Sequence, residues 1–301
     1  MRRLEPDDQA AGLRRLLGSQ SKLRALAVFG PDAELNAIAC ANLAIALSQR
    51  GDKICLIDET QPPHNVTSQC GMSPSHGLAD VAHGRLSLDE ALTTGPYDGL
   101  RILKADQGFN HAAETDDRIW NRIGEDFTRH EWDWALLAAP SDERPSLALA
   151  APLRLLVLPA VKSRLTEAYV VLKAAHNRQS DARWLALFMN ATDNDKVGQL
   201  MSALNETARQ FLGIEPELLG AIPKDALLDQ AARALRPILE LSPAAPAAQA
   251  MRQMAENLHA EPAMETRLDA KVFWQRMGLL SRMSQPSRYP KRHAQHGRAY
   301  G

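Results

Sequence analysis

The sequence predicts an α/β protein with a mostly parallel sheet and helices on both faces of that sheet. Seven short apolar runs, each typical of a buried strand, alternate with longer segments of helical periodicity. Strands and helices that alternate in this way form βαβ units, in which the strands lie parallel in one sheet. The chain has 301 residues and a hydrophobic share of 45%, which suits one large domain with a sizeable core.

The strand-like runs are short, rich in aliphatic residues and bounded by polar or turn-forming residues. They cover residues 23–29, 53–58, 100–103, 134–139, 153–158, 184–190 and 218–222. Helical periodicity covers residues 34–49, 165–176, 195–212 and 244–258. The first of these helices is rich in alanine and is followed by Gly51, a residue type that commonly ends helices.

Composition divides the chain into three parts: an N-terminal helical segment (1–22), the α/β domain (23–259) and a C-terminal part (260–301). The C-terminal part begins as a polar linker, has helical periodicity at residues 272–283, and ends in a basic tail. The tail, residues 284–301, has four Lys or Arg residues, no acidic residue and no apolar run. Such a segment cannot bury enough apolar surface to fold, so we expect it to be disordered.

Charge and cysteine content exclude several classes of function. Lys and Arg number 35 and Asp and Glu number 36, so no overall field attracts nucleic acid, and we expect no nucleic-acid partner. The three cysteines, Cys40, Cys55 and Cys70, are odd in number and lack CxxC spacing, which argues against a disulfide framework or a zinc site. We see neither a signal peptide nor the ~20 apolar residues of a membrane span, and expect a cytoplasmic protein.

The turn after the first predicted strand is where a sheet of this kind binds phosphate. A working phosphate loop needs glycines whose neighbouring N–H groups surround the phosphates, a lysine for their charge, and a Ser or Thr for magnesium. Residues 29–37 have the sequence FGPDAELNA, with Gly30 as the one glycine. Pro31 has no N–H to donate, and Asp32 and Glu34 add negative charge where a triphosphate would lie. The loop has therefore lost the residues that handle phosphate.

Other segments of the chain resemble the MinD/ParA family of deviant P-loop ATPases. The similar segments are NLA (42–44), ICLID (54–58), GLADV (77–81), GLRIL (99–103), WDWALLAAP (132–140) and IPKD (222–225). The N-terminal sequence DQAAGLR (8–14) is similar to the DQA-x-x-LR helix of the flagellar-number regulators FlhG and FleN. The resemblance spans roughly residues 7–280 and implies a P-loop NTPase-type fold.

The resemblance assigns the family's functional positions to residues of this chain. With a loop one residue shorter, the signature lysine falls on Pro31, the second lysine on Asn36, and the magnesium-binding threonine on Ala37. On the second strand, Asp58 matches the first aspartate of the family's D-x-D pair, while Thr60 replaces the second.

The Walker B aspartate of the family falls on Ala138. Charge is thus lost at several positions that act on one phosphate–magnesium cluster, which is hard to reconcile with an active ATPase. Gly30, Asn36 and Asp58 are then vestigial positions of a nucleotide site. We expect no cofactor, with ATP and magnesium bound only if residual affinity survives.

Three further positions match residues that contact the adenine base in the family. These are Asn190, Pro223 and Asp225. Their presence is compatible with weak residual nucleotide binding. The alternative is that Asn190 simply ends a strand and Pro223 shapes the turn that follows.

The N-terminal helix has an apolar stripe formed by Ala10, Leu13 and Leu17. The resemblance implies that this segment docks on a flagellar SRP-type GTPase, the FlhF protein, with Gln9 contributing to the stimulated site. The expected partner-binding residues are Asp8, Gln9, Ala10, Leu13 and Arg14. The alternative is a helix that packs on its own domain, but the predicted sheet does not need it, so we favour docking.

The predicted helix at 272–283 carries apolar side chains beside Arg276 and Arg282. The resemblance implies a membrane-targeting helix near this end, with Phe273, Trp274, Met277 and Leu280 as the lipid-binding residues. In that case the protein would associate weakly with the inner membrane or the cell pole. A helix that packs against the sheet is an equally good interpretation.

The leading hypothesis is a non-catalytic FlhG/FleN-like regulator of flagellar number or placement. It would bind a flagellar SRP-type GTPase or a flagellar transcription activator. One alternative is a divergent MinD/ParA-type ATPase that still hydrolyses ATP. Another is a ParA-like scaffold in a different positioning or secretion system.

Overall fold

The computed structural model describes residues 22–95, 97–105, 117–141, 146–261 and 267–283. The predicted N-terminal helix, with Asp8, Gln9, Ala10, Leu13 and Arg14, lies outside the described residues, as does the predicted tail at 284–301.

The described strands form one sheet with the order β3-β4-β2-β5-β1-β6-β7-β8, and β9 also pairs with β1. The strands are β1 (Lys22–Phe29), β2 (Ile54–Asp58), β3 (Thr93–Thr94), β4 (Leu100–Lys104), β5 (Trp134–Ala138), β6 (Leu153–Pro159), β7 (Arg183–Ala191), β8 (Glu217–Pro223) and β9 (Arg267–Asp269). All seven predicted strands are present and parallel. The additional strands β3 and β9 are antiparallel and only two and three residues long, too short to produce a sequence pattern.

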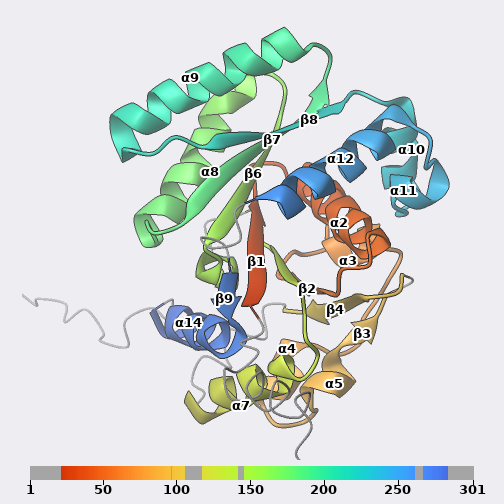
Figure 1. Ribbon diagram of the computed structural model, residues 1–301, viewed down its shortest axis with the longest axis vertical. Coiled ribbons are helices and arrows are strands. Elements are labelled where there is room, and N and C mark those ends of the chain that lie inside the picture. The colour runs from red at the N-terminus through yellow and green to blue at the C-terminus, as the bar shows by residue number, and fades with distance from the viewer. Residues whose placement is uncertain (1–21, 96, 106–116, 142–145, 262–266, 284–301) are drawn as a thin grey trace, which may run out of the picture.

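Helices cover both faces of the sheet, as predicted (Figure 1). They are α2 (Ala33–Gln49), α3 (Val66–Gln69), α4 (Leu78–Ala82), α5 (Leu88–Ala91), α7 (Asp117–Thr128), α8 (Leu165–Arg178), α9 (Asn194–Leu212), α10 (Ala226–Arg233), α11 (Ile238–Leu241), α12 (Pro246–Ala260) and α14 (Ala270–Met283), with the short 3-10 helices η1 (Leu147–Ala150) and η2 (Lys162–Arg164). The core on one face includes α2 and α12, and the core on the other includes α7, α8, α9 and α14.

Helix α2 follows β1 directly and is buried along most of its length. Its N-cap is Asp32, whose carboxylate accepts a hydrogen bond from the backbone N–H of Leu35 at 3.1 Å. Small side chains let the helix lie close to the sheet, because Ala37, Ala41 and Ala44 have no exposed surface. This close packing fixes the turn between β1 and α2, where the predicted site lies.

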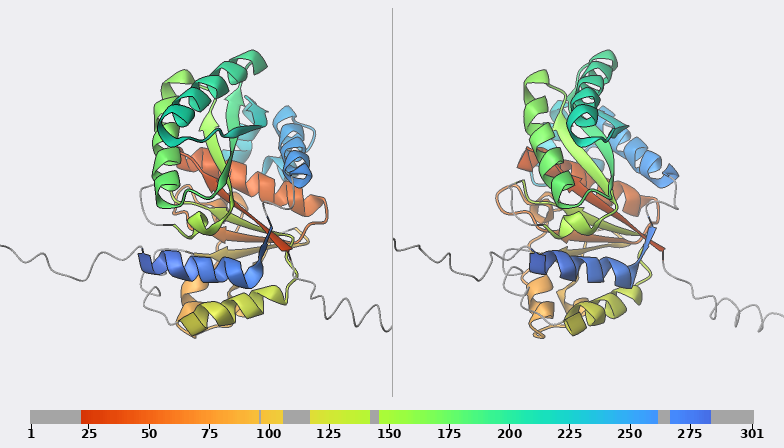
Figure 2. Two further views of the ribbon diagram at one scale, coloured as in Figure 1. Left: turned by 60° about the vertical axis from the view of Figure 1, so that its left-hand side comes forward. Right: turned by 90° about the vertical axis from the view of Figure 1, so that its left-hand side faces the viewer.

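The α/β unit continues past residue 259, where we had expected it to end. Strand β9 pairs with the start of β1, and α14 packs against α7. Figure 2 shows α7 and α14 side by side in both views.

The membrane-binding residues expected on α14 are mostly buried. Phe273, Trp274 and Met277 have no exposed surface, and Leu280 is partly buried against the same core. The ring of Trp274 lies 6.2 Å from that of Trp120 on α7, measured between centroids. These side chains fill a protein core in this position of α14, so they are not available to contact lipid there. No described helix is long and apolar enough to cross a membrane.

Candidate functional site

The expected site lies at the carboxyl ends of β1, β2 and β5, where parallel sheets of this class bind ligands. Ala138, at the end of β5, pairs in register with Val28 on one side and with Asp58 on the other. The Walker B position therefore does lie between the loop after β1 and the aspartate of β2. An alanine side chain there supplies no ligand for a metal ion.

Asn36 fills the inside of the loop that follows β1. Its side chain is 2% exposed, and its Nδ2 donates to the carbonyl oxygen of Gly30 at 2.9 Å. A Cβ atom on residue 30 would lie 2.2 Å from both the Oδ1 of Asn36 and the carbonyl oxygen of Val157. Only glycine fits this approach, so Gly30 is required for packing whether or not phosphate binds.

The guanidinium of Arg164 lies near the loop, but two carboxylates of the chain pair with it. Nη2 of Arg164, from η2, lies 3.7 Å from Oδ2 of Asp32. Nη1 of the same guanidinium lies 3.0 Å from Glu167. The positive charge at this position is therefore already opposed by two negative charges of the chain itself.

Asp58 is buried, and its carboxylate accepts hydrogen bonds from two threonines, Thr60 and Thr67. Its Oδ1 accepts from the backbone N–H and the hydroxyl of Thr60, with the N–H at 2.9 Å. Its Oδ2 accepts from the backbone N–H and the hydroxyl of Thr67, with the N–H at 2.8 Å. Four donors satisfy this carboxylate, which gives Asp58 a structural role in holding the start of α3.

Glu59, the next residue, holds the other side of the site. It is 9% exposed and accepts hydrogen bonds from the hydroxyl of Ser146 and the backbone N–H groups of Leu147 and Ala148, each at 2.9 Å. Burial raises the pKa of this carboxyl to about 7, although the hydrogen bonds act in the opposite direction. Glu59 thereby fixes the first residues of η1 beside the carboxyl end of β2.

A cavity of about 330 Å³ lies beside the loop, against one side of α8. Its lining is mainly apolar and includes Phe29, Pro31, Pro140, Leu149, Val171 and Ala174. The polar residues of the lining are Ser141, Ser146, Glu167 and Arg178, which include one carboxylate and one guanidinium.

The residues at the adenine positions have local structural roles. Asp225 caps two helices, since its Oδ1 accepts from the N–H of Leu227 at 2.9 Å and its Oδ2 from that of Ala247 at 3.1 Å. Asn190 lies near the end of β7 with a φ of 59°, and Pro223 is the last residue of β8. β7 and β8 are the second and third strands from β1 in the sheet, on the side of β6.

Together these observations do not fit bound ATP and magnesium. The loop holds an amide where the family has a phosphate-binding lysine, the nearby guanidinium faces Asp32, and the hydrogen-bonding capacity of Asp58 is used within the chain. Sequence reasoning missed Glu59 and Arg164. Neither lies in a recognisable motif. Arg164 meets Asp32, and Glu59 meets Ser146 across 87 positions of sequence, only through folding of the chain.

Comparison with known proteins gives one similar curated protein. The chain is 27% identical over 256 residues to the antiactivator FleN of Pseudomonas aeruginosa, a match that covers 82% of this chain and 90% of FleN. No family model matches the chain.

Several solved structures share the fold. The cell-division ATPase MinD of Pyrococcus furiosus has a TM-score of 0.61 and 21% identity, covering 78% of this chain and 98% of MinD. MinD of Aquifex aeolicus has a TM-score of 0.61 and 20% identity, with coverage of 79% and 98%. A ParA family ATPase of Chlorobium tepidum has a TM-score of 0.60 and 15% identity, with coverage of 79% and 99%.

The structural likeness establishes the fold, and the sequence similarity to FleN extends along most of both chains. The chain therefore has the fold of the MinD and ParA ATPases and is similar in sequence to the antiactivator FleN.

Proposed function

We propose that this protein is a FlhG/FleN-like regulator of flagellar biosynthesis that acts by binding a partner and does not hydrolyse ATP. The observation that carries this proposal is the Asn36–Gly30 hydrogen bond. It closes the loop on itself at 2.9 Å, with the Asn36 side chain 2% exposed. A nucleotide phosphate would have to displace a buried amide and would then meet Asp32 without a lysine to offset its charge.

The partner is a flagellar transcription activator or a flagellar SRP-type GTPase. The similarity to FleN supports the activator, because FleN is an antiactivator. The DQA-x-x-LR motif supports the GTPase, through Gln9 and Leu13 in particular.

Complementation of a deletion strain tests the proposal. Wild-type protein should restore the normal number and placement of flagella, and the variant Asn36→Ala should restore them equally. The structurally matched control is Asn42→Ala. Asn42 is another buried asparagine of α2, and it lies away from the loop. Its side-chain amide donates to the carbonyl oxygen of Ile38 and accepts from the N–H of Ile238. Micromolar ATP affinity of the purified protein, or turnover above a no-enzyme blank, would contradict the proposal.

One observation favours the rival function, a divergent ATPase. Arg164 comes close to the loop and is the kind of residue that stabilises charge in phosphoryl transfer. If Arg164 acted in catalysis, turnover would be measurable and Arg164→Ala would remove it, whereas Lys162→Ala in the same η2 turn would not.

A further inference from the structure

The cavity beside the loop follows one face of α8. Six residues of α8 line it at spacings that place them on the same side of the helix: Glu167, Val170, Val171, Ala174, Ala175 and Arg178. They span three turns, or roughly 16 Å along the helix axis. The opposite wall comes from Phe29 at the end of β1, Pro140 after β5 and Leu149 of η1. This elongated cavity, called the α8 slot below, has a volume of about 330 Å³, which is enough for a small molecule.

The two ends of the α8 slot differ in charge. Glu167 lines the end near the loop, where Asp32 adds a second carboxylate and Arg164 is the cation that both share. Arg178 lines the slot three turns further along α8, at the last residue of the helix. An anionic group is therefore repelled at the loop end and attracted at the end of Arg178.

A second guanidinium lies behind the wall at the end of Arg178. Arg154 has no exposed surface and donates to the carbonyl oxygens of Leu149 at 2.9 Å, Ala175 at 3.3 Å and Gln179 at 2.7 Å. Leu149 and Ala175 both line the slot. The bonds also occupy carbonyl oxygens at the C-terminus of α8, whose partial negative charge would otherwise oppose an anion at this end.

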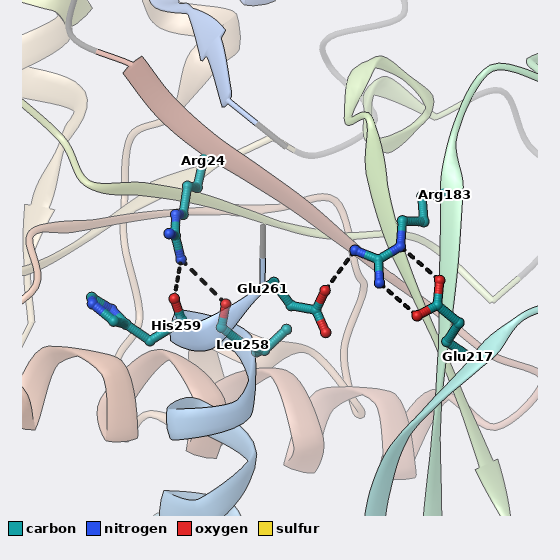
Figure 3. A network of polar contacts seen from close by, with 6 residues as sticks. All are labelled: Arg24, Arg183, Glu217, Leu258, His259 and Glu261. Carbon is teal, nitrogen blue, oxygen red and sulfur yellow. Dashed lines mark hydrogen bonds and ion pairs between the residues drawn. The ribbon is translucent and has the colours of Figure 1, made fainter. Parts of the chain in front are cut away.

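The charge of Arg154 is not neutralised by a direct ion pair. Its hydrogen bonds within the described chain all go to carbonyl oxygens, and Asp181, which acts on it through space, already pairs with Arg276. The arrangement around Arg183, on the neighbouring strand, is different, because that guanidinium pairs with two glutamates at 2.6 and 2.5 Å (Figure 3). Two arginines thus share one aspartate beside the slot, which leaves an excess of positive charge at this end.

The walls of the α8 slot are held in place by contacts within the protein. The ring of Phe29 lies 5.6 Å from that of Trp184, measured between centroids, and the guanidinium of Arg154 lies 5.5 Å from the centroid of the same tryptophan. On the side of η1, the hydroxyl of Ser146 donates to the buried carboxyl of Glu59 at 2.9 Å. A ligand would therefore enter a preformed site and would not have to order these walls.

We propose that the α8 slot binds a small carboxylic acid with an apolar body, of the medium-chain or arylalkanoic class. The carboxylate lies at Arg178, and the apolar body extends along α8 between Val171 and Ala174 on one side and Phe29 and Leu149 on the other. Burial of apolar surface supplies most of the affinity, and the charge at the two ends sets the orientation. This site is separate from the partner binding proposed above and does not depend on it.

Calorimetric titration of the full chain with octanoate, octanol and octylamine tests the class of ligand. The three probes share one apolar body and differ in their head groups. Octanoate should bind saturably with one site per chain, about threefold to tenfold more tightly than octanol, and octylamine should bind most weakly. Equal or tighter binding of octylamine, or the absence of saturable octanoate binding in the millimolar range, would overturn the proposal.

The position of the head group is tested by removing its charge partner. Arg178→Gln should weaken octanoate binding about threefold to tenfold and leave octanol binding unchanged. Lys173→Gln is the matched control, because it removes one positive charge from an exposed position of α8 outside the slot lining. Equal losses in the two variants would show a diffuse charge effect and would overturn the placement of the carboxylate.

The location of the apolar body is tested by filling the slot. Ala174→Phe should abolish octanoate binding, whereas Asn177→Phe, exposed in the next turn and outside the lining, should retain it. In the wild-type protein, NMR spectra recorded with octanoate should show shifts of the amides of Phe29, Leu149 and Val171. This measurement decides the location even if Ala174→Phe does not fold. Full binding by a folded Ala174→Phe variant, or shifts confined to other parts of the chain, would overturn the site.

Discussion

The side-chain amide of Asn36 donates a hydrogen bond to the main-chain carbonyl of Gly30, 2.9 Å away, across the loop between β1 and α2. In the resembled family, the position of Asn36 holds a phosphate-binding lysine. The contact ties the Asn36 side chain to the backbone of the loop, while the Oδ1 of Asn36 is buried without a hydrogen-bond partner among the described residues. The structure needs glycine at this position because Val157 and Asn36 leave no room for a Cβ atom, whether or not phosphate binds.

Restoring the lysine should not restore an ATPase. The variant Asn36→Lys introduces the missing charge but leaves Pro31, Ala37 and Ala138 in place, so magnesium and the loop still lack ligands. We expect no turnover above the blank, and calorimetric titration with ATP should show at most weak binding in both proteins. Turnover by Asn36→Lys would show that the rest of the site is intact.

Substitution of Gly30 should destabilise the fold. Gly30→Ala places a methyl group 2.2 Å from the backbone oxygen of Val157, which belongs to a central strand and cannot move cheaply. Overpacking of this kind costs about 1–3 kcal/mol, measurable by chemical denaturation. Gly198→Ala is the control, because a Cβ atom at that exposed helical position meets nothing within 4 Å. It should be neutral or slightly stabilising.

The buried carboxyl of Glu59 should make stability depend on pH. Its pKa is raised by burial from 4.5 to about 7, so between these values the folded state binds more protons than the unfolded chain. The stabilising contribution of the protonated carboxyl is complete below pH 4.5 and is lost as the pH rises through 7. The full effect is about 3 kcal/mol as an order of magnitude.

Denaturation at pH 4.5 to 8 measures this contribution. Wild type should lose stability relative to Glu59→Gln as the pH rises over this range. Glu217→Gln is the opposite control, because hydrogen bonds from Arg183 lower the pKa of Glu217. Wild type should lose stability relative to that variant only as the pH falls below 4.5, so this control is followed to lower pH. A flat difference between wild type and Glu59→Gln would show that the hydrogen bonds to Glu59 cancel the effect of burial.

Substitutions on the buried face of α14 should destabilise the protein, and substitutions on its exposed face should not. Trp274→Ala should cost about 3–5 kcal/mol, because it removes a fully buried ring packed on Trp120 and Phe127. Leu279→Ser, on the exposed face, should change stability by less than about 0.5 kcal/mol. Thermal unfolding of the two variants distinguishes this arrangement from an interfacial helix, for which Trp274→Ala would be tolerated in solution.

The fold was predictable because its signals are local. Each strand from β1 to β8 except β3 is an apolar run, and the alternation with helices implies a parallel sheet. The structure of the C-terminal part was not predictable in the same way. A helix with Phe273 and Trp274 beside arginines has the same periodicity whether it faces lipid or α7, and only the fold supplies the aromatic residues of α7 against which it packs.

The sequence predicted which residues of the family's phosphate site are missing. It did not predict the contacts that form in their place. The residues at 31, 36, 37 and 138 predict from sequence alone that the phosphate site is degenerate. The hydrogen bond from Asn36 to Gly30 depends on the direction of the Asn36 side chain. The contact of Arg164 with Asp32 joins residues more than 100 positions apart in sequence. Neither can be read from a local sequence pattern. The helix α7 is an intermediate case. Trp120, Ile123 and Phe127 recur at helical spacing, but the polar residues around them hide the pattern.

The N-terminal segment yields the most direct functional prediction. A docking peptide needs only a local helix and a receptive groove, so its function does not require ATP hydrolysis by the same chain. We expect a peptide of residues 1–22 to bind a flagellar SRP-type GTPase in its GTP-bound state and to raise its hydrolysis rate. Gln9→Ala should remove most of the stimulation and leave binding largely intact, if Gln9 orients the attacking water or nearby charge. Leu13→Asp should abolish binding, because it places an unpaired charge in an apolar contact.

Arg15→Ala serves as the control for this series, since Arg15 lies outside the motif and off the apolar stripe of Ala10, Leu13 and Leu17. Stimulation should be measured as GTP turnover at saturating peptide, and binding by fluorescence anisotropy of a labelled peptide, so that the two effects separate. Equal stimulation by the wild-type and Gln9→Ala peptides would remove Gln9 from the mechanism. If neither the peptide nor the full chain stimulates the GTPase, the GTPase half of the proposed function fails and the transcription activator is the partner to test next.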